Sequence, residues 1–177
     1  MKRYILTGAP GAGKTVLLRA LERAGHVVVD EAATDVIALA QAEGVAEPWT
    51  DPGFVDAIVK LQKQREARAV GDIVFFDRSP VCALALARFL GHPVSPWLRA
   101  ELDRIAAERV YQRRVLLVRS LGFITPTAAR RISLDEALAF GRAHEEAYQE
   151  LGYDLVAVEP GSVSERLATV LARITEA

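Results

Sequence analysis

The segment at 8–15, which reads GAPGAGKT, constrains the fold of this chain more than any other part of its sequence. It matches the pattern G-x-x-x-x-G-K-[ST] and lies between an apolar run of strand length and an amphipathic stretch. Such a loop needs a strand before it and a helix after it, because its backbone N–H groups and the helix N-terminus must point at one anion. The segment therefore predicts an α/β fold with a phosphate-binding loop after its first strand.

Each position of this loop has an expected chemical role. The Lys14 ammonium should contact the β- and γ-phosphates of a nucleotide, and the Thr15 hydroxyl should ligate Mg²⁺. The loop thus predicts a nucleoside triphosphate and Mg²⁺ as cofactors; ATP is the expected nucleotide, and GTP is the alternative. The predicted nucleotide-binding residues are those of the motif: Gly8, Ala9, Pro10, Gly11, Ala12, Gly13, Lys14 and Thr15.

Beyond the loop, strand-length apolar runs alternate with amphipathic segments, which is typical of a parallel α/β sheet. The runs are almost continuously apolar, as in strands covered by helices on both faces. We find no internal repeat or linker, so we expect a single domain over 1–177. The predicted strands are 3–7, 26–29, 72–76, 114–118 and 154–158, and the predicted helices are 14–24, 34–43, 52–70, 80–90, 96–111, 134–151 and 163–175.

Composition excludes several classes of protein. Of 177 residues, 51% are hydrophobic and 25% charged, which is ordinary for a globular chain, and the net charge of −1 gives no sign of a nucleic-acid partner. A single cysteine, Cys82, permits no disulfide within the chain and no cysteine-based zinc site. No apolar run has the length of a membrane span or signal peptide, so we expect a cytoplasmic protein without a membrane partner. Oligomerisation stays open. Because the chain contains no Asn, guanine recognition through an Asn-Lys-x-Asp motif is impossible.

Acidic residues follow two of the predicted strands, where ligands of open α/β sheets bind. Asp77 ends the third run and is expected to hold Mg²⁺, with Arg78 beside it facing phosphates; Asp77 could instead cap the following helix. Asp30 and Glu31 follow the second run. One of them can accept the proton of an attacking hydroxyl, while the other interacts favourably with the dipole at the N-terminus of the following helix. We predict Glu31 for the catalytic role and both residues for substrate contact.

The segment at 119–133 carries Arg119, Arg130 and Arg131 and is expected to act as a lid over a bound triphosphate. The alternative is that Arg130 and Arg131 end a short helix and satisfy its C-terminal dipole. We predict that at least one of these arginines contacts phosphate.

Other candidates carry less information. On the helix expected at 52–70, Gln62 and Arg65 are assigned to an outward charged face, from which Arg65 is the candidate for substrate or phosphate contact. Trp49 either walls a substrate pocket or covers the edge of the core. His144 lies at helical spacing from Phe140 and is assigned to packing.

Together these motifs resemble the kinase-like branch of P-loop NTPases. The chain looks most like the small AAA-type ATPase domains that include the ribosylnicotinamide kinase domain of bacterial NAD regulators. The resemblance rests on GAPGAGKT, VVVDEA, FFDRSP, TAARRIS and HEEAYQELGYDLV, which span nearly the whole chain. It implies a five-stranded sheet of order 2-3-1-4-5.

A similar Asp/Glu-Arg-Ser triplet occurs in deoxynucleoside kinases. That resemblance implies that Glu31 is the base, Asp77 the Mg²⁺ partner and Arg78 a phosphate contact, with Arg130 or Arg131 as the lid arginine. The predicted function is therefore transfer of the γ-phosphate of Mg·ATP to a hydroxyl of a small, nucleoside-like molecule. The alternative is a regulatory ATPase that acts through a protein partner.

Overall fold

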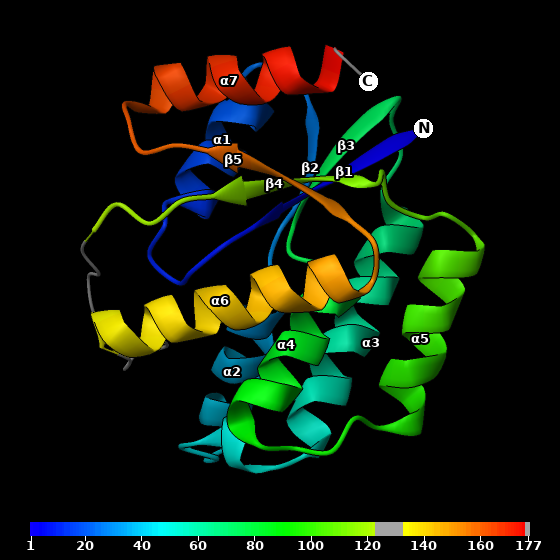
Figure 1. Ribbon diagram of the computed structural model, residues 1–177. Helices are drawn as coiled ribbons and strands as arrows, with labels where there is room; N and C mark the ends of the chain where they lie inside the picture. Colours follow the sequence, from blue (N-terminus) through cyan, green and yellow to red (C-terminus); the bar gives the residue numbers. More distant parts are fainter. Residues whose placement is uncertain (123–132, 176–177) are drawn as a thin grey trace.

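In the computed structural model, which describes residues 1–122 and 133–175, a parallel five-stranded sheet lies between two layers of helices (Figure 1). The strands run in the order β2-β3-β1-β4-β5, which confirms the predicted order. Because β1 is central, the loop that follows it opens at the middle of the carboxyl edge of the sheet. The strands are β1 (Lys2–Thr7), β2 (Val27–Val29), β3 (Ile73–Asp77), β4 (Arg114–Val118) and β5 (Asp154–Val158).

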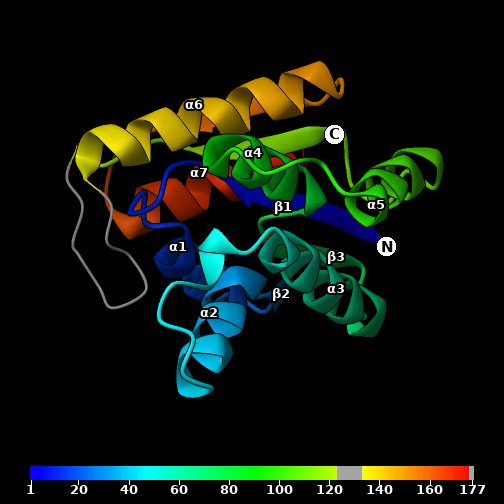
Figure 2. The same cartoon turned by 90° about the horizontal axis from the view of Figure 1, so that it is seen from below.

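The helices divide unequally between the two faces of the sheet. Helices α1 (Lys14–Arg23) and α7 (Val163–Thr175) pack together on one face. The larger layer covers the opposite face and spreads below it (Figures 1 and 2). It comprises α2 (Ala32–Ala42), the short 3₁₀ helix η1 (Pro48–Thr50), α3 (Gly53–Arg68), α4 (Pro80–Leu90), α5 (Pro96–Ala107) and α6 (Leu134–Glu150).

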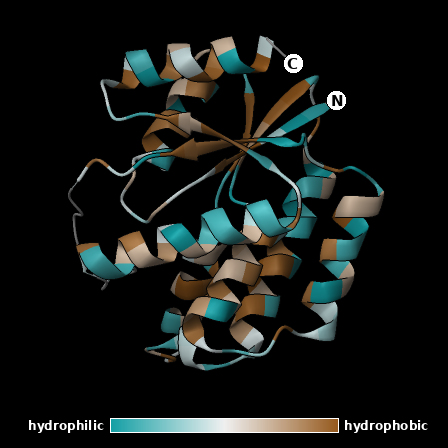
Figure 3. Ribbon diagram, in the orientation of Figure 1, coloured by the Kyte–Doolittle hydropathy of each residue, from teal (hydrophilic) through white to brown (hydrophobic). Residues whose placement is uncertain are grey.

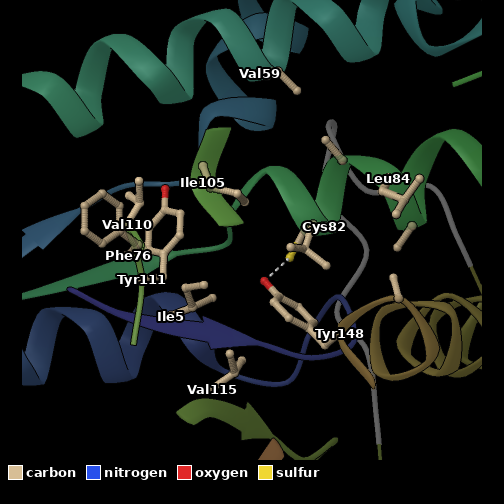
Figure 4. Packing of buried hydrophobic residues seen from close by; sticks show 14 of the residues in the cluster. Ile5, Val59, Phe76, Cys82, Leu84, Ile105, Val110, Tyr111, Val115 and Tyr148 are labelled. Carbon is tan, nitrogen blue, oxygen red and sulfur yellow. Dashed lines mark hydrogen bonds between the residues drawn. The ribbon is translucent and has the colours of Figure 1, made fainter. Parts of the chain in front are cut away.

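Alternate residues of the strands supply the core on each face. Tyr4 and Leu6 of β1 pack with the apolar residues of α1 and α7, whereas Ile5 between them joins the core under α3, α4 and α6. Apolar residues therefore dominate the strands, as Figure 3 shows. In the larger core, the Tyr148 hydroxyl of α6 lies 3.2 Å from Cys82 Sγ of α4, which joins these two helices (Figure 4). Because α4 begins shortly after β3 ends, the packing of α4 against α6 also fixes the end of β3 relative to α6.

Among the helix boundaries that differ from expectation, two have a local reason. Helix α5 was expected to reach residue 111 but ends at Ala107. Arg109 adopts a left-handed φ of 48°, and the Val110 N–H bonds back to the Ile105 carbonyl, which closes a Schellman-type end. Helix α2 begins at Ala32, two residues early, so that Glu31 occupies its N-cap position.

No helix within residues 1–122 and 133–175 has the length and apolar character required to cross a membrane.

Candidate active site

The glycine-rich loop passes so close to β4 that its first position admits only glycine. Gly8 has a φ of 133°, and a Cβ at this position would lie 2.2 Å from the carbonyl oxygen of Val118. Gly11 and Gly13 also adopt left-handed φ values of 82°. The loop can therefore curl around its own lysine only with glycines at these positions.

Lys14 points back into the loop that precedes it. Its ammonium donates hydrogen bonds to the carbonyl oxygens of Gly8, at 3.1 Å, and Ala9, at 3.0 Å. Burial of the side chain, reinforced by the charge of Arg78, lowers the pKa of Lys14 to about 8. A buried ammonium in this position favours the binding of an anion. Negatively charged phosphate oxygens would stabilise the ammonium, which burial has deprived of water.

Asp77 at the end of β3 is buried and incompletely hydrogen-bonded. Its Oδ2 accepts a hydrogen bond from the Thr15 hydroxyl at 3.3 Å, while Oδ1 has no partner among the described residues. Burial raises the pKa of this carboxyl, although Lys14 acts in the opposite direction. A free carboxylate oxygen beside a hydroxyl is a donor set that a hard cation such as Mg²⁺ prefers, so these two residues fit a magnesium ion.

Glu31 and Arg78 meet where the ends of β2 and β3 lie side by side. The Arg78 Nε donates to Glu31 Oε1 over 2.5 Å, and the Thr34 hydroxyl donates to Oε2 over 3.2 Å. Arg78 has a left-handed φ of 75°, which is uncommon for a residue with a side chain. Burial alone would raise the pKa of Glu31, but the charges of Arg78 and Lys14 outweigh it and hold the pKa below its usual value. Glu31 is therefore a carboxylate at neutral pH.

One cavity of about 800 Å³ joins these groups to a deep hollow in the larger helical layer. Lys14, Thr15, Asp77, Glu31 and Arg78 line the part beside the glycine-rich loop. A cavity of this size suits a small organic molecule. The site therefore has a polar part at the loop and a second part formed by helices.

The lining side chains from α2, η1, α3 and α4 are all uncharged, and most are apolar. Gln62 of α3 is a polar residue among them. It is only 3% exposed, and its Oε1 has no partner among the described residues. The principal walls of this hollow, which we call the helical hollow, are Ile37, Trp49, Phe54, Ile58, Gln62, Ala83, Leu86 and Leu90.

Two of the predicted substrate or phosphate contacts, Asp30 and Arg65, lie outside the cavity lining. Asp30 is ion-paired with Arg19 of α1. Arg65 donates to the carbonyl oxygens of Asp30, at 3.0 Å, and Glu31, at 2.8 Å, and pairs with Asp35. Arg65 thus stabilises the backbone turn between β2 and α2. Because it binds the Glu31 carbonyl oxygen, it helps to fix the position of Glu31.

The predicted lid is described only at its two ends. Arg119 pairs with Glu145 of α6 at 2.9 Å, and Leu121 lines the cavity. Ser133 and Glu136 form a capping box at the start of α6. Arg130 and Arg131 lie outside the described residues.

Two further polar residues of the cavity were not predicted as site residues. Gln62, assigned to a solvated face, is buried, and that assignment was wrong because its side of α3 faces the cavity. A signal was available, since Gln62 follows the buried Phe54 and Ile58 at spacings of four residues. His144 is also buried and lines the cavity, four residues after Phe140 on α6. Trp49 does line the pocket, as one of its two interpretations expected.

Comparisons of sequence agree with this arrangement. A family model described as an AAA domain matches residues 3–166. A nucleotide-binding protein of Herminiimonas arsenicoxydans is 27% identical over 154 residues, which are 86% of this chain and 49% of that protein. The chain thus spans about half the length of this curated relative.

Solved structures share the fold. A NadR protein in complex with NAD and AMP-PNP matches with a TM-score of 0.68 and 16% identity, over 98% of this chain and 49% of that one. A deoxyadenosine kinase from M. mycoides matches with a TM-score of 0.66 and 12% identity, over 98% of each chain. Shikimate kinase from Acinetobacter baumannii matches with a TM-score of 0.58 and 15% identity, over 99% of this chain and 94% of that one. The fold is therefore that of kinase-like P-loop proteins, as the resemblance predicted.

Proposed function

This chain belongs to the AAA domain family, and we propose that it transfers the γ-phosphate of Mg·ATP to a hydroxyl group of a small, neutral, nucleoside-like molecule. The observation that carries the proposal is the continuity of the cavity, which joins the glycine-rich loop to the helical hollow. A protein that only hydrolyses ATP needs no second compartment of this kind. In this proposal the donor phosphate and the acceptor hydroxyl would meet beside Glu31 and Arg78, which line the cavity.

The glycine-rich loop is the proposed donor site. Its N–H groups and the start of α1 would hold the β- and γ-phosphates, with Lys14 turned from its loop carbonyls toward them. Thr15 and Asp77 would hold Mg²⁺, because the unpartnered Asp77 Oδ1 is available for it. A Mg²⁺ ion held there would supply positive charge that offsets the negative charge developing on the phosphate during transfer.

The helical hollow is the proposed acceptor site, and its chemistry limits what can bind. Apolar and aromatic walls favour a flat ring, and Trp49 and Phe54 offer aromatic surfaces against which such a ring can pack. No charged side chain of α2, η1, α3 or α4 lines the hollow, so a phosphate or carboxylate on the distal part of the acceptor would be desolvated without a partner. Gln62 Oε1, which has no partner among the described residues, would accept a hydrogen bond from the ring edge of the acceptor.

Glu31 is the proposed base for the acceptor hydroxyl. Its carboxylate is ionised at neutral pH and held by Arg78 and Thr34, so that it can orient the hydroxyl and take its proton as the phosphate is transferred. The transition state of phosphoryl transfer is largely dissociative, so a weak base in the correct place suffices. Arg130 and Arg131 stay the proposed lid arginines, of which at least one would contact phosphate.

ADP release in the presence of Mg·ATP tests this proposal. The purified protein is assayed alone and then with nucleosides, nucleoside monophosphates and hydroxy acids. We expect a low basal rate that rises at least tenfold with one neutral nucleoside-like compound and not with its monophosphate. A substantial basal rate that no compound changes would instead identify a regulatory ATPase.

A further inference from the structure

A hydrogen bond from α6 holds Arg78 on the side opposite Glu31. The Nη1 of Arg78 lies 2.7 Å from the Nε2 of His144, and the His144 Nδ1 lies 2.7 Å from the carbonyl oxygen of Phe140. A carbonyl oxygen can only accept a hydrogen bond and a guanidinium can only donate one. The imidazole therefore carries its proton on Nδ1, and its Nε2 accepts from Arg78. In this arrangement His144 is neutral.

These contacts restrain the guanidinium of Arg78 from three directions. Glu31 holds its Nε, His144 holds its Nη1, and the ring of Phe140 lies 5.8 Å from its central carbon. The guanidinium is a rigid plane, so fixing two of its nitrogens also fixes the directions of its remaining N–H groups. Its Nη2 has no hydrogen-bond partner within the described residues and is available to a ligand.

A neutral imidazole suits this position beside Arg78 better than a carboxylate would. A carboxylate in its place would add a second negative charge beside Glu31 and repel an incoming phosphate. A neutral acceptor restrains Arg78 without cancelling its charge. Burial lowers the pKa of His144 well below its usual value, and the charges of Arg78 and Lys14 act in the same direction.

We infer that His144 is a positioning residue, which holds the Arg78 guanidinium beside Glu31 so that its free N–H groups face the phosphate during transfer. The catalytic part of this inference rests on the proposed function. The hydrogen bond and the tautomer on which it depends do not, and they can be tested without any activity.

Two substitutions of His144 separate positioning from packing. His144→Phe keeps a ring but removes the acceptor, and we expect the kcat for phosphate transfer to fall 10- to 100-fold while the Kd for Mg·ATP changes less than twofold. His144→Gln restores an uncharged acceptor, and we expect kcat within about threefold of wild type. His26→Phe is the matched control, because the His26 ring packs edge-on against Phe75 on the α1 side of the sheet, away from the cavity. Circular dichroism checks that each variant is folded.

A second readout is ¹⁵N NMR of the histidine rings in the full chain. We expect the His144 signals of a neutral ring protonated on Nδ1 at pH 7, and a changed Nε2 signal in Arg78→Met, because this variant removes the donor to Nε2. An Nε2-protonated or charged ring, a ring unaffected by Arg78→Met, or a His144→Phe variant with wild-type kcat would overturn the inference. If the wild-type protein phosphorylates no acceptor, the proposed function fails, and the NMR result alone then decides whether His144 positions Arg78.

Discussion

Arg78 and Glu31, 47 residues apart in the chain, form an ion pair of 2.5 Å that joins the end of β3 to the start of α2. The pair keeps Glu31 ionised although the surrounding protein removes much of its water. It also gives the carboxylate a fixed direction at the junction of the loop and the helical hollow. The proposed base and the proposed phosphate contact thus depend on each other, which leads to the first prediction.

Replacing Glu31 by Gln removes the proton acceptor while the size of the side chain is kept. We expect kcat for phosphate transfer to fall about 100-fold, in the range found for general bases, with the Kd for Mg·ATP nearly unchanged. Steady-state kinetics and calorimetric titration measure the two quantities. Asp30→Asn is the control and should stay fully active, since Asp30 pairs with Arg19 outside the cavity. A fully active Glu31→Gln variant would move the role of base to Asp77.

Replacing Gln62 by Leu should separate stability from substrate binding. Because Gln62 Oε1 is buried without a partner, an apolar side chain removes a desolvation cost, and we expect an unchanged or higher free energy of unfolding. At the same time the KM for the acceptor should rise about tenfold, and the KM for ATP should not. Urea denaturation and kinetics test this together. A variant that is destabilised, with an unchanged acceptor KM, would show that Gln62 has only a structural role.

Replacing Gly8 by Ala should destabilise the fold strongly. The new Cβ would meet the Val118 carbonyl oxygen at 2.2 Å, in a backbone conformation that is itself unfavourable for alanine. We expect a loss of about 3 kcal/mol or more in the free energy of unfolding. Gly25→Ala is the matched control, since Gly25 also has a left-handed φ, of 93°, but nothing lies within 4 Å of its Cβ position. It should cost about 1 kcal/mol. Equal losses would mean that the loop moves away from β4 at little cost.

The buried neutral His144 should make the fold sensitive to mild acid. Its pKa is well below 6.5 in the folded chain and returns to about 6.5 on unfolding, so the unfolded chain binds the extra proton. The free energy of unfolding should therefore fall as the pH drops below 6.5, by about 1 kcal/mol between pH 7.5 and 5.5 from this group. Denaturation of wild type and His144→Gln at both values measures the difference. Parallel losses in the two proteins would contradict this assignment.

Much of the fold was predictable because its signals are local. The GAPGAGKT segment specifies a strand, a loop and a helix through glycine φ values and one lysine, and continuous apolar runs indicate strands covered on both sides. The strand order came from the resemblance, since local patterns do not say which strands are neighbours. The end of α5 was missed because Arg109, a residue without special turn preference, adopts the left-handed conformation there.

The site was predictable only in part, because its composition depends on how distant elements meet. Asp77, Arg78 and Glu31 follow strands, and the rule that ligands bind at the carboxyl edge was enough to group them. The sequence predicted both Asp30 and Glu31 as substrate contacts, but only Glu31 lines the cavity, while Asp30 pairs with Arg19. Gln62 and His144 lie on helices, where only the packing of α3 and α6 decides which polar residues face the cavity.

The fate of the γ-phosphate tests the central claim most directly. The protein is incubated with [γ-³²P]ATP, Mg²⁺ and the compound that raises ADP release, and labelled products are separated by chromatography. Lys14→Ala, which should bind ATP too weakly to turn over, is the negative control, and Lys60→Ala on the exposed face of α3 is its matched control. Our account predicts one labelled phosphate ester for each ADP formed. Label found only in inorganic phosphate, in equal amount to ADP, would contradict it and identify an ATPase.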